Sequence, residues 1–491
     1  MTIRIPFDNS YARLPDAFHR RTLPTPVGAP RLITLNRALA AELGLDPDAL
    51  AGAEGAEALA GNATLSGSEP IATAYAGHQF GQFVPQLGDG RAILLGEVVD
   101  AGGTRRDIQL KGAGPTPFSR RGDGRAALGP VLREYLVSEA MAALGVPTTR
   151  ALAAATTGEP VLRETTLPGA VLTRVASSHI RVGTFQYFAA RGNVDALRTL
   201  VGHVIARHYA QAQSRDDCAL ALLENVVARQ AGLIAQWMHV GFVHGVMNTD
   251  NCSIAGETID YGPCAFLDVY DPKAVFSSID SYGRYAFANQ PAIAQWNLAR
   301  LAECLLPLIS DNDETAIALA TEALDRFEPA FDAAYLGGHR LKLGLRSERD
   351  GDAALIRDLL ERMATGRADH TLTFRRLAAF ASGSPSAVGG ELFDDPALFE
   401  DWAGRYQARL ESDPEDPSAR RRRMERASPA IIPRNHQVEA VIRSAVEDDD
   451  LAPFEALTAA LADPYDPSAD DSPYAAPPPR DSGPYRTFCG T

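Results

Sequence analysis

A polar loop near the middle of the chain carries the residues best suited to phosphate chemistry. It runs from His244 to Asn251 and is followed by Asp260-Tyr261-Gly262. A magnesium ion that bridges phosphates prefers hard oxygen ligands, which a carboxamide and a carboxylate provide without closing its coordination shell. We therefore predict Asn251 and Asp260 as metal ligands and Asp250 as the base that accepts a hydroxyl proton. Each residue alone would more often shape a turn, so the prediction depends on the spacing of the whole set.

The spacing of this loop is that of the catalytic loop of protein kinases, H-R-D-x-x-x-x-N, which is followed by D-F-G. His244 and Asn251 keep the outer positions, and Asp-Tyr-Gly stands where kinases have Asp-Phe-Gly. Val246 replaces the usual catalytic aspartate, and a carboxylate reappears at Asp250. The pattern therefore predicts kinase-like metal binding with a displaced base.

A second pair of residues fits the same chemistry. Lys111 ends a predicted strand, and Glu134 lies on the helix that follows. In kinases a strand lysine is ion-paired to a helix glutamate, which holds the ammonium group against phosphate. Judged alone, the pair is about as well explained by two unrelated surface charges.

Glycine-rich loops and arginines near these residues suit a nucleotide. Small residues let the backbone approach a phosphate, and guanidinium groups bind phosphate through two hydrogen bonds. Most short glycine pairs are only hairpin turns, and most exposed arginines only keep a protein soluble. The candidate nucleotide-binding residues are Gly88, Gly90, Arg91, Lys111, Asp123, Gly124, Arg174, Arg181 and Asp260.

The order of predicted elements agrees with this site. Strand-like runs at 83–87, 92–99 and 107–111 precede a helix at 130–144 and two further strands, and helical patterns dominate from about residue 190. We predict an α+β, protein-kinase-like fold with a small β-rich lobe and a larger helical lobe. The expected division is an N-terminal extension (1–66), the β-rich N-lobe (67–176), the helical C-lobe (177–410) and a C-terminal extension with a Pro/Asp-rich tail (411–491).

Composition limits the class of partner. The 491-residue chain has a formal net charge of −15, which argues against general affinity for nucleic acid or anionic membranes. We see no signal peptide and no apolar window as long as a membrane span, and the five cysteines are too scattered for a disulfide framework. These features favour a cytoplasmic protein.

Several longer motifs resemble the selenoprotein O family. They are QLKGAGPTPFSRRGDGR (109–125), LREYLVSEAM (132–141), GVPTTR (145–150), HGVMNTDN (244–251) and GRYAFANQP (283–291). The resemblance covers the chain from about residue 70 to the C-terminus. It implies an atypical kinase that binds ATP in an inverted orientation and transfers AMP to Ser, Thr or Tyr of proteins, with Mg²⁺ or Mn²⁺ as cofactor and ATP as co-substrate.

The same resemblance assigns roles to individual residues. It makes Asp250 the proton acceptor, Asn251 and Asp260 the metal ligands, and the candidate nucleotide-binding residues the ATP site. It also places Cys489 where some family members have selenocysteine, which makes this cysteine a candidate redox-accessible thiol. Some relatives pair this residue with a cysteine in the segment after the metal loop, but the equivalent stretch here, 274–278, has none. If Cys489 forms a disulfide, we therefore expect Cys264 or Cys252 as its partner.

Three alternatives to AMP transfer remain open at this point. Transfer of UMP from UTP with Mn²⁺ would use the same residues. Ordinary phosphoryl transfer is disfavoured by Val246, which stands where a kinase has its base. A non-catalytic nucleotide-binding scaffold is disfavoured because a scaffold has no need of a base such as Asp250.

Overall fold

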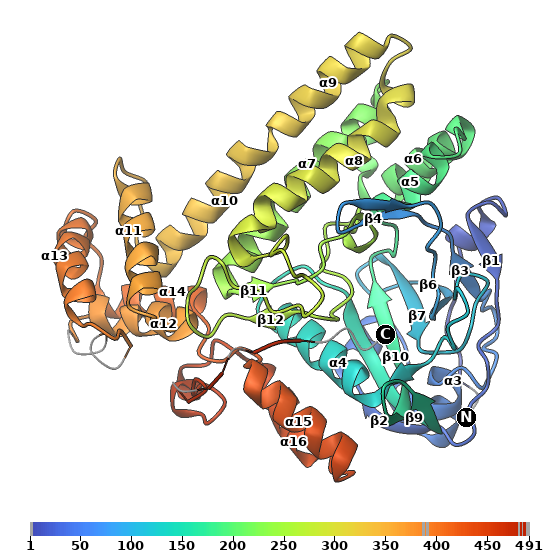
Figure 1. The fold of residues 1–491 in the computed structure, drawn as a ribbon, viewed down its shortest axis with the longest axis horizontal. Helices are drawn as coiled ribbons and strands as arrows, with labels where there is room; N and C mark the ends of the chain where they lie inside the picture. Colours follow the sequence, from blue (N-terminus) through green and yellow to red (C-terminus); the bar gives the residue numbers. More distant parts are fainter. Residues whose placement is uncertain (1–2, 385–387, 389–391, 480–481, 484, 488–491) are drawn as a thin grey trace.

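The computed structural model describes residues 3–384, 388, 392–479, 482–483 and 485–487. Figure 1 shows two unlike parts: a β-sheet with short helices at one side, and a bundle of longer helices at the other. The segment that contains the predicted catalytic loop lies between them. This mixed arrangement confirms the predicted sheet lobe and helical lobe.

One large antiparallel sheet forms the core of the first lobe. Its strands run in the order β1-β3-β6-β7-β10-β9-β2, with β8 paired to β10. The longest pair, β9 and β10, is a hairpin where the sequence predicted only two short strands. The strands are β1 (His19–Arg21), β2 (Arg31–Leu35), β3 (Ile71–Thr73), β6 (Ala92–Val99), β7 (Arg105–Lys111), β8 (Ala126–Ala127), β9 (Arg150–Leu162) and β10 (Thr166–Ala176).

Alternating side chains give the sheet two apolar faces, because successive residues of a strand point to opposite sides. One face packs against three short N-terminal helices, α1 (Arg37–Glu42), α2 (Pro47–Ala51) and α3 (Ala53–Leu59), through residues such as Ile93, Ile108 and Val171. The other face packs against α4 (Leu128–Ala143) through Ala154, Ala170 and Leu172. The N-terminal residues thus contribute two strands and one helical layer to this lobe.

The helical lobe is built around α7 (Cys218–Val240), which packs against α8 (Gln290–Ile309) and α10 (Phe327–Lys342). By length and composition α7 is apolar enough to cross a membrane, so the expectation that no such window exists was wrong. However, 67% of that window is buried, as in a core helix. The other helices are α5 (Val182–Ala189), α6 (Val194–His208), α9 (Asp313–Asp325), α11 (Asp352–Thr365), α12 (His370–Ala381), α13 (Ala397–Glu411) and α14 (Pro417–Ala427).

The C-terminal region returns to the sheet lobe. Helices α15 (Asn435–Glu447) and α16 (Ala452–Leu461) pack on α4 and share its apolar cluster. Beyond them, Thr487 pairs with the segment after the catalytic loop, since its N–H donates to Phe276 O at 2.8 Å and its carbonyl accepts from Ser278 N at 2.9 Å. The tail therefore lies against the region between the lobes.

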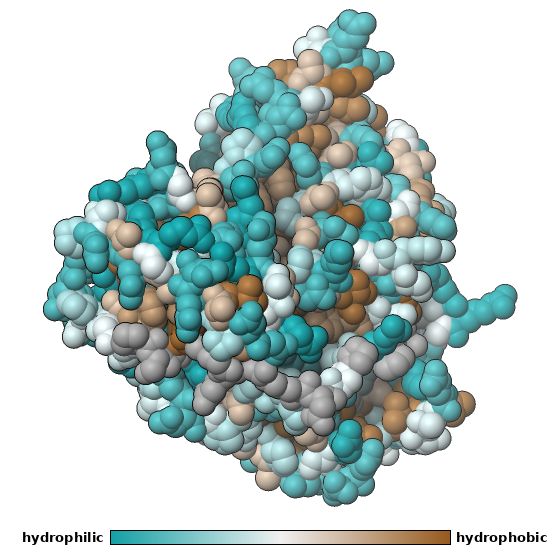
Figure 2. All heavy atoms as spheres, turned by 60° about the vertical axis from the view of Figure 1, so that its left-hand side comes forward, coloured by the Kyte–Doolittle hydropathy of each residue, from teal (hydrophilic) through white to brown (hydrophobic). Residues whose placement is uncertain are grey.

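Two short antiparallel strand pairs lie apart from the large sheet, next to the loop between the lobes. Strands β4 (Gly77–Gln79) and β5 (Gln82–Val84) form one of them, and β11 (Phe242–Val243) and β12 (Ala265–Phe266) form the other. The face drawn in Figure 2 is mostly hydrophilic, with hydrophobic side chains exposed in small separate groups.

Candidate active site

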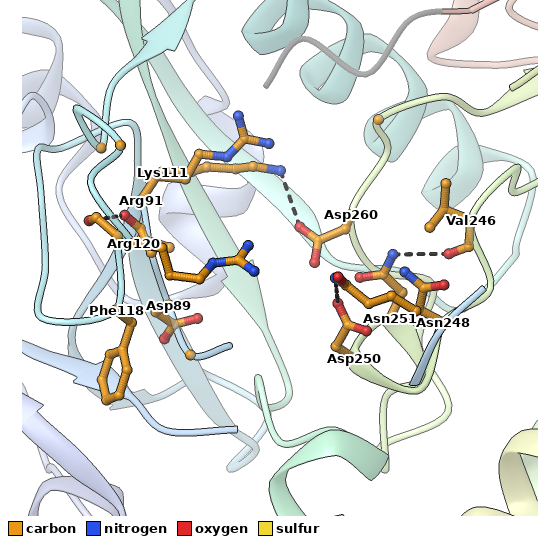
Figure 3. Close-up of a pocket in the computed structure, with 18 of the residues that line it drawn as sticks. Asp89, Arg91, Lys111, Phe118, Arg120, Val246, Asn248, Asp250, Asn251 and Asp260 are labelled. Carbon is orange, nitrogen blue, oxygen red and sulfur yellow. Dashed lines mark hydrogen bonds and ion pairs between the residues drawn. The ribbon is translucent and has the colours of Figure 1, made fainter. Parts of the chain in front are cut away.

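A cavity of about 620 Å³ lies between the two lobes. The structure brings together at this cavity all the residues predicted for nucleotide, metal and base: Gly88, Gly90, Arg91, Lys111, Asp123, Gly124, Arg174, Arg181, Asp250, Asn251 and Asp260. Figure 3 shows glycine-rich loops from the sheet lobe on one side and the catalytic loop on the other. Glu134 does not line the cavity and acts on it through Lys111.

A compact ionic cluster occupies one part of this cavity. Lys111 at the end of β7 contacts Asp260 Oδ1 at 3.1 Å and Glu134 Oε2 at 2.5 Å. Arg174 on β10 contacts the same two carboxylates, at 2.5 Å from Asp260 Oδ1 and 3.2 Å from Glu134 Oε1. Arg181 Nη1 lies 3.1 Å from Asp260 Oδ2. Three cations thus face two carboxylates, which leaves a net positive charge suited to phosphate.

Burial strengthens the interactions between the charges of this cluster. The side chains of Arg174 and Arg181 are only 2% exposed, so their charges are poorly screened by water. Burial alone would raise the pKa of Asp260, but the nearby Arg174, Lys111 and Arg181 hold it well below the usual value. Asp260 is therefore ionised, as a metal ligand must be. Its backbone is also in the left-handed region, with φ of 66°.

The predicted base sits in a 3₁₀ turn, Thr249–Asn251. Asp250 Oδ2 accepts a hydrogen bond from Gln79 Nε2 at 3.2 Å, whereas Oδ1 is buried and has no partner among the described residues. Burial raises the pKa of Asp250 to about 6. Oδ1 faces the β4–β5 hairpin, where a Cβ atom on Gly77 would come within 2.7 Å of it, so the buried, unpartnered oxygen keeps the carboxylate poorly solvated.

The rest of the catalytic loop is held in place by main-chain contacts. His244 is buried, with Nε2 at 2.9 Å from Ile259 O, and its N–H donates to Gln290 Oε1 at 3.1 Å. Asn251 Nδ2 donates to Val246 O at 2.9 Å, as Figure 3 shows. Because this bond uses the amide nitrogen, the carbonyl oxygen of Asn251 is the atom left for a metal ion.

The donor set of the loop fits a divalent metal. Asn251 and Asp260 supply a carboxamide and an ionised carboxylate, which are hard oxygen ligands of the kind that Mg²⁺ and Mn²⁺ accept. Among the described residues there is no group of three or more His, Cys, Asp or Glu that could hold a metal ion alone. These two residues therefore fit an ion that takes its remaining ligands from nucleotide phosphates and water.

The glycine-rich loops need glycine for steric reasons. Gly88 has φ of 76°, and a Cβ atom there would come within 2.3 Å of the Phe118 ring. Gly124 has φ of 66°, and its Cβ would come within 2.1 Å of the Gly114 backbone. Asp123, beside Gly124, is ion-paired to Arg163 at 2.8 Å. Both loops are thus closely packed and can present backbone N–H groups to a nucleotide.

Some residues of the site were missed by sequence reasoning. Gln79 comes from the β4–β5 hairpin and reaches Asp250, which lies 171 positions later in the chain. Buried Asp89 accepts hydrogen bonds from Thr73 and Gln109. The sequence Gly77-His-Gln-Phe-Gly81 has the small residues of a tight turn, and this was the one available signal for the hairpin.

The cysteines near the site are buried. Burial raises the pKa of the thiols of Cys252 and Cys264 to about 12. Cys489 lies outside the described residues, so its redox role and any disulfide remain predictions. Thr487 Oγ1 donates to Pro263 O at 2.8 Å, which brings the described end of the tail next to Cys264.

Comparison with known proteins decides the family. The family described as "Protein adenylyltransferase SelO" matches residues 1–462. The chain belongs to the SelO family. The match starts at residue 1, so the resemblance extends over the first 70 residues as well.

Relatives named "Protein nucleotidyltransferase YdiU" agree with this assignment over their whole length. The protein of Bradyrhizobium sp. (strain ORS 278) is 64% identical over 491 residues. The Methylorubrum extorquens protein is 64% identical over 498 residues, and that of Rhodopseudomonas palustris (strain BisB18) is 62% identical over 491. In each case the alignment covers 100% of both chains. The similarity therefore extends over the full length of these relatives.

Proposed function

We propose that this SelO-family enzyme transfers AMP from ATP to Ser, Thr or Tyr hydroxyl groups of proteins and releases pyrophosphate. Membership of a family of protein nucleotidyltransferases supports the reaction class. The observation that carries the residue assignment is that Asp250, whose pKa is raised to about 6 by burial, lines the same cavity as Lys111, Arg174 and Arg181. One cavity thus combines a base with an anion-binding cluster.

The reaction requires the acceptor hydroxyl to attack the α-phosphorus while the bond to pyrophosphate breaks. Asp250 is the group that takes the hydroxyl proton. Inverted binding of ATP places the α-phosphate near Asp250 and directs the outer phosphates to Lys111, Arg174 and Arg181. These cations then stabilise the charge that develops on pyrophosphate. When bound by Asn251 and Asp260, Mg²⁺ or Mn²⁺ neutralises phosphate charge and polarises the phosphorus.

Glu134 has a positioning role in this scheme. Its carboxylate contacts both Lys111 and Arg174 and is itself buried, so it fixes two of the three phosphate-binding cations. The Lys111–Glu134 pair supports a protein-kinase-like arrangement of the two lobes. The boundaries 66/67, 176/177 and 410/411, and a cytoplasmic location, remain predictions.

Intact-mass spectrometry of acceptor proteins tests the reaction. After incubation with ATP and Mg²⁺ or Mn²⁺, the acceptor should gain the mass of AMP and lose it on phosphodiesterase treatment. The Asp260→Ala enzyme should add nothing. Gain of a phosphate mass would identify a kinase, and a gain only with UTP would identify UMP transfer. No gain under any of these conditions would favour a nucleotide-binding scaffold.

A further inference from the structure

One sequence motif, GRYAFANQP at 283–291, lies beside the site and is only partly explained by catalysis. Two of its residues support the catalytic loop: Tyr285 donates to Asn248 Oδ1 at 2.6 Å, and Gln290 accepts from His244 N at 3.1 Å. The side chain of Arg284 takes part in neither contact. No carboxylate of the described residues lies within ion-pair distance of it, and its buried Nε has no hydrogen-bond partner among them.

Arg284 belongs to a small cluster centred on Trp296 of α8. Its guanidinium lies 4.8 Å from the centre of the indole ring, and that of Arg300 lies 4.9 Å from the same ring. Contact with the ring face holds both cations at this surface. Arg300 is paired with Glu303 at 2.5 Å, so the uncompensated charge of this pair of arginines is on Arg284. We call Arg284, Trp296 and Arg300 the arginine–tryptophan cluster.

The β4–β5 hairpin connects this cluster to the catalytic base. Gln79 of the hairpin binds Asp250, and Phe80 N donates to Asn248 Oδ1 at 3.0 Å. At the hairpin turn, a Cβ atom on Gly81 would lie 3.7 Å from Arg284 Cζ. The cluster is therefore separated from Asp250 by a single layer of residues.

The cluster lies outside the nucleotide cavity and close to its edge. None of its three residues lines the nucleotide cavity, although Phe80 and Ile279 do. Ile279 is 52% exposed and Tyr282, in the same segment, is 99% exposed. Large exposed apolar side chains beside a reaction site offer contact to a protein chain. These two side chains lie in the segment that leads into the motif of Arg284.

Charge complementarity indicates what the cluster binds. In a chain with net charge −15, an uncompensated arginine beside the base attracts a carboxylate locally, and electrostatic complementarity gives specificity. We propose that the arginine–tryptophan cluster is the acceptor-recognition surface and that Arg284 binds an acidic side chain near the modified hydroxyl of the protein substrate. This inference rests on the proposed function and specifies its substrate class.

Matched acceptor peptides test the proposal. Each peptide has one hydroxyl residue and differs only in having Glu or Gln at successive neighbouring positions. With the wild-type enzyme, kcat/KM for AMP transfer should be roughly tenfold or more higher for the best Glu peptide, the factor expected of one charge-assisted hydrogen bond. Arg284→Gln should reduce the Glu peptide to the level of its Gln counterpart and leave the Gln peptide unchanged. Arg284→Glu should instead favour a peptide with Lys at that position.

Arg357→Gln, which changes an exposed arginine on α11, is the matched control and should keep the preference for the Glu peptide. An unchanged preference in Arg284→Gln would overturn the inference, and so would equal losses on both peptides, since these indicate a structural role. If the wild-type enzyme labels peptides without any charge preference, or labels only itself, the proposed function stands and the inference fails. If no acceptor is labelled, both fail.

Discussion

Replacing the base gives the sharpest prediction about a single residue. In Asp250→Asn the side chain keeps its size and can still accept the hydrogen bond from Gln79 Nε2. The amide nitrogen of the asparagine takes the place of the other carboxylate oxygen, the buried Oδ1 that has no hydrogen-bond partner among the described residues. The variant therefore keeps its local contacts and loses only the ability to take a proton.

The expected loss in the rate of AMP transfer is about a hundredfold to ten-thousandfold, the usual contribution of a general base. Nucleotide affinity should stay the same or increase, because a negative charge near the phosphates is removed. Single-turnover transfer measures the rate, and calorimetric titration with a non-hydrolysable ATP analogue measures the affinity. A variant with wild-type rate would show that Asp250 is not the base, and lost binding with a lower unfolding temperature would make the residue structural.

Three further predictions follow from the described contacts. Lys111→Met should slow transfer roughly a hundredfold with little change in the unfolding temperature, because Asp260 and Glu134 keep Arg174 as a partner; Glu134→Gln should act in the same direction. Loss of folding in both variants, seen by thermal unfolding, would make the pair structural. Gly124→Ala should lower the free energy of unfolding by about 1–3 kcal/mol, since a side chain is strained at φ of 66°; an unchanged urea midpoint would contradict this. Lys342 is buried, with its ammonium over the Phe374 ring, and burial lowers its pKa to about 7 from 10.5. Between these pH values the unfolded chain binds more protons than the folded one, so stability should rise with pH. Lys342→Met should be more stable than wild type at pH 7, and its free energy of unfolding should increase much less between pH 7 and pH 10.5. Urea unfolding across this pH range measures both effects. A variant that is less stable than wild type at pH 7 would contradict the reasoning.

The sequence predicted local elements better than it predicted their partners. Strands β6 and β7 and helix α4 were expected, because each has a local hydrophobic pattern and ends at turn residues. The pairing of β2 with β9 and of β1 with β3 was not expected. Strands β1 and β2 are only three and five residues long, too short for a clear alternating pattern, and strand pairing depends on contacts remote in sequence.

In the candidate site, too, the sequence predicted local features but not the contacts between residues far apart in the chain. The spacing of Asp250, Asn251 and Asp260 is enough to predict metal and proton chemistry, because these residues lie close together in the chain. By contrast, the contact of Gln79 with Asp250 spans 171 positions, and no periodicity of the sequence encodes it. The convergence of Lys111, Arg174 and Arg181 on Asp260 likewise depends on how the lobes pack.

The most direct test of the central claim is to follow the two ends of the triphosphate separately. With ATP labelled at the α-phosphate, the account predicts labelled protein. With ATP labelled at the γ-phosphate, it predicts unlabelled protein and labelled pyrophosphate. Label transferred from the γ-phosphate to protein would contradict inverted binding and identify an ordinary kinase.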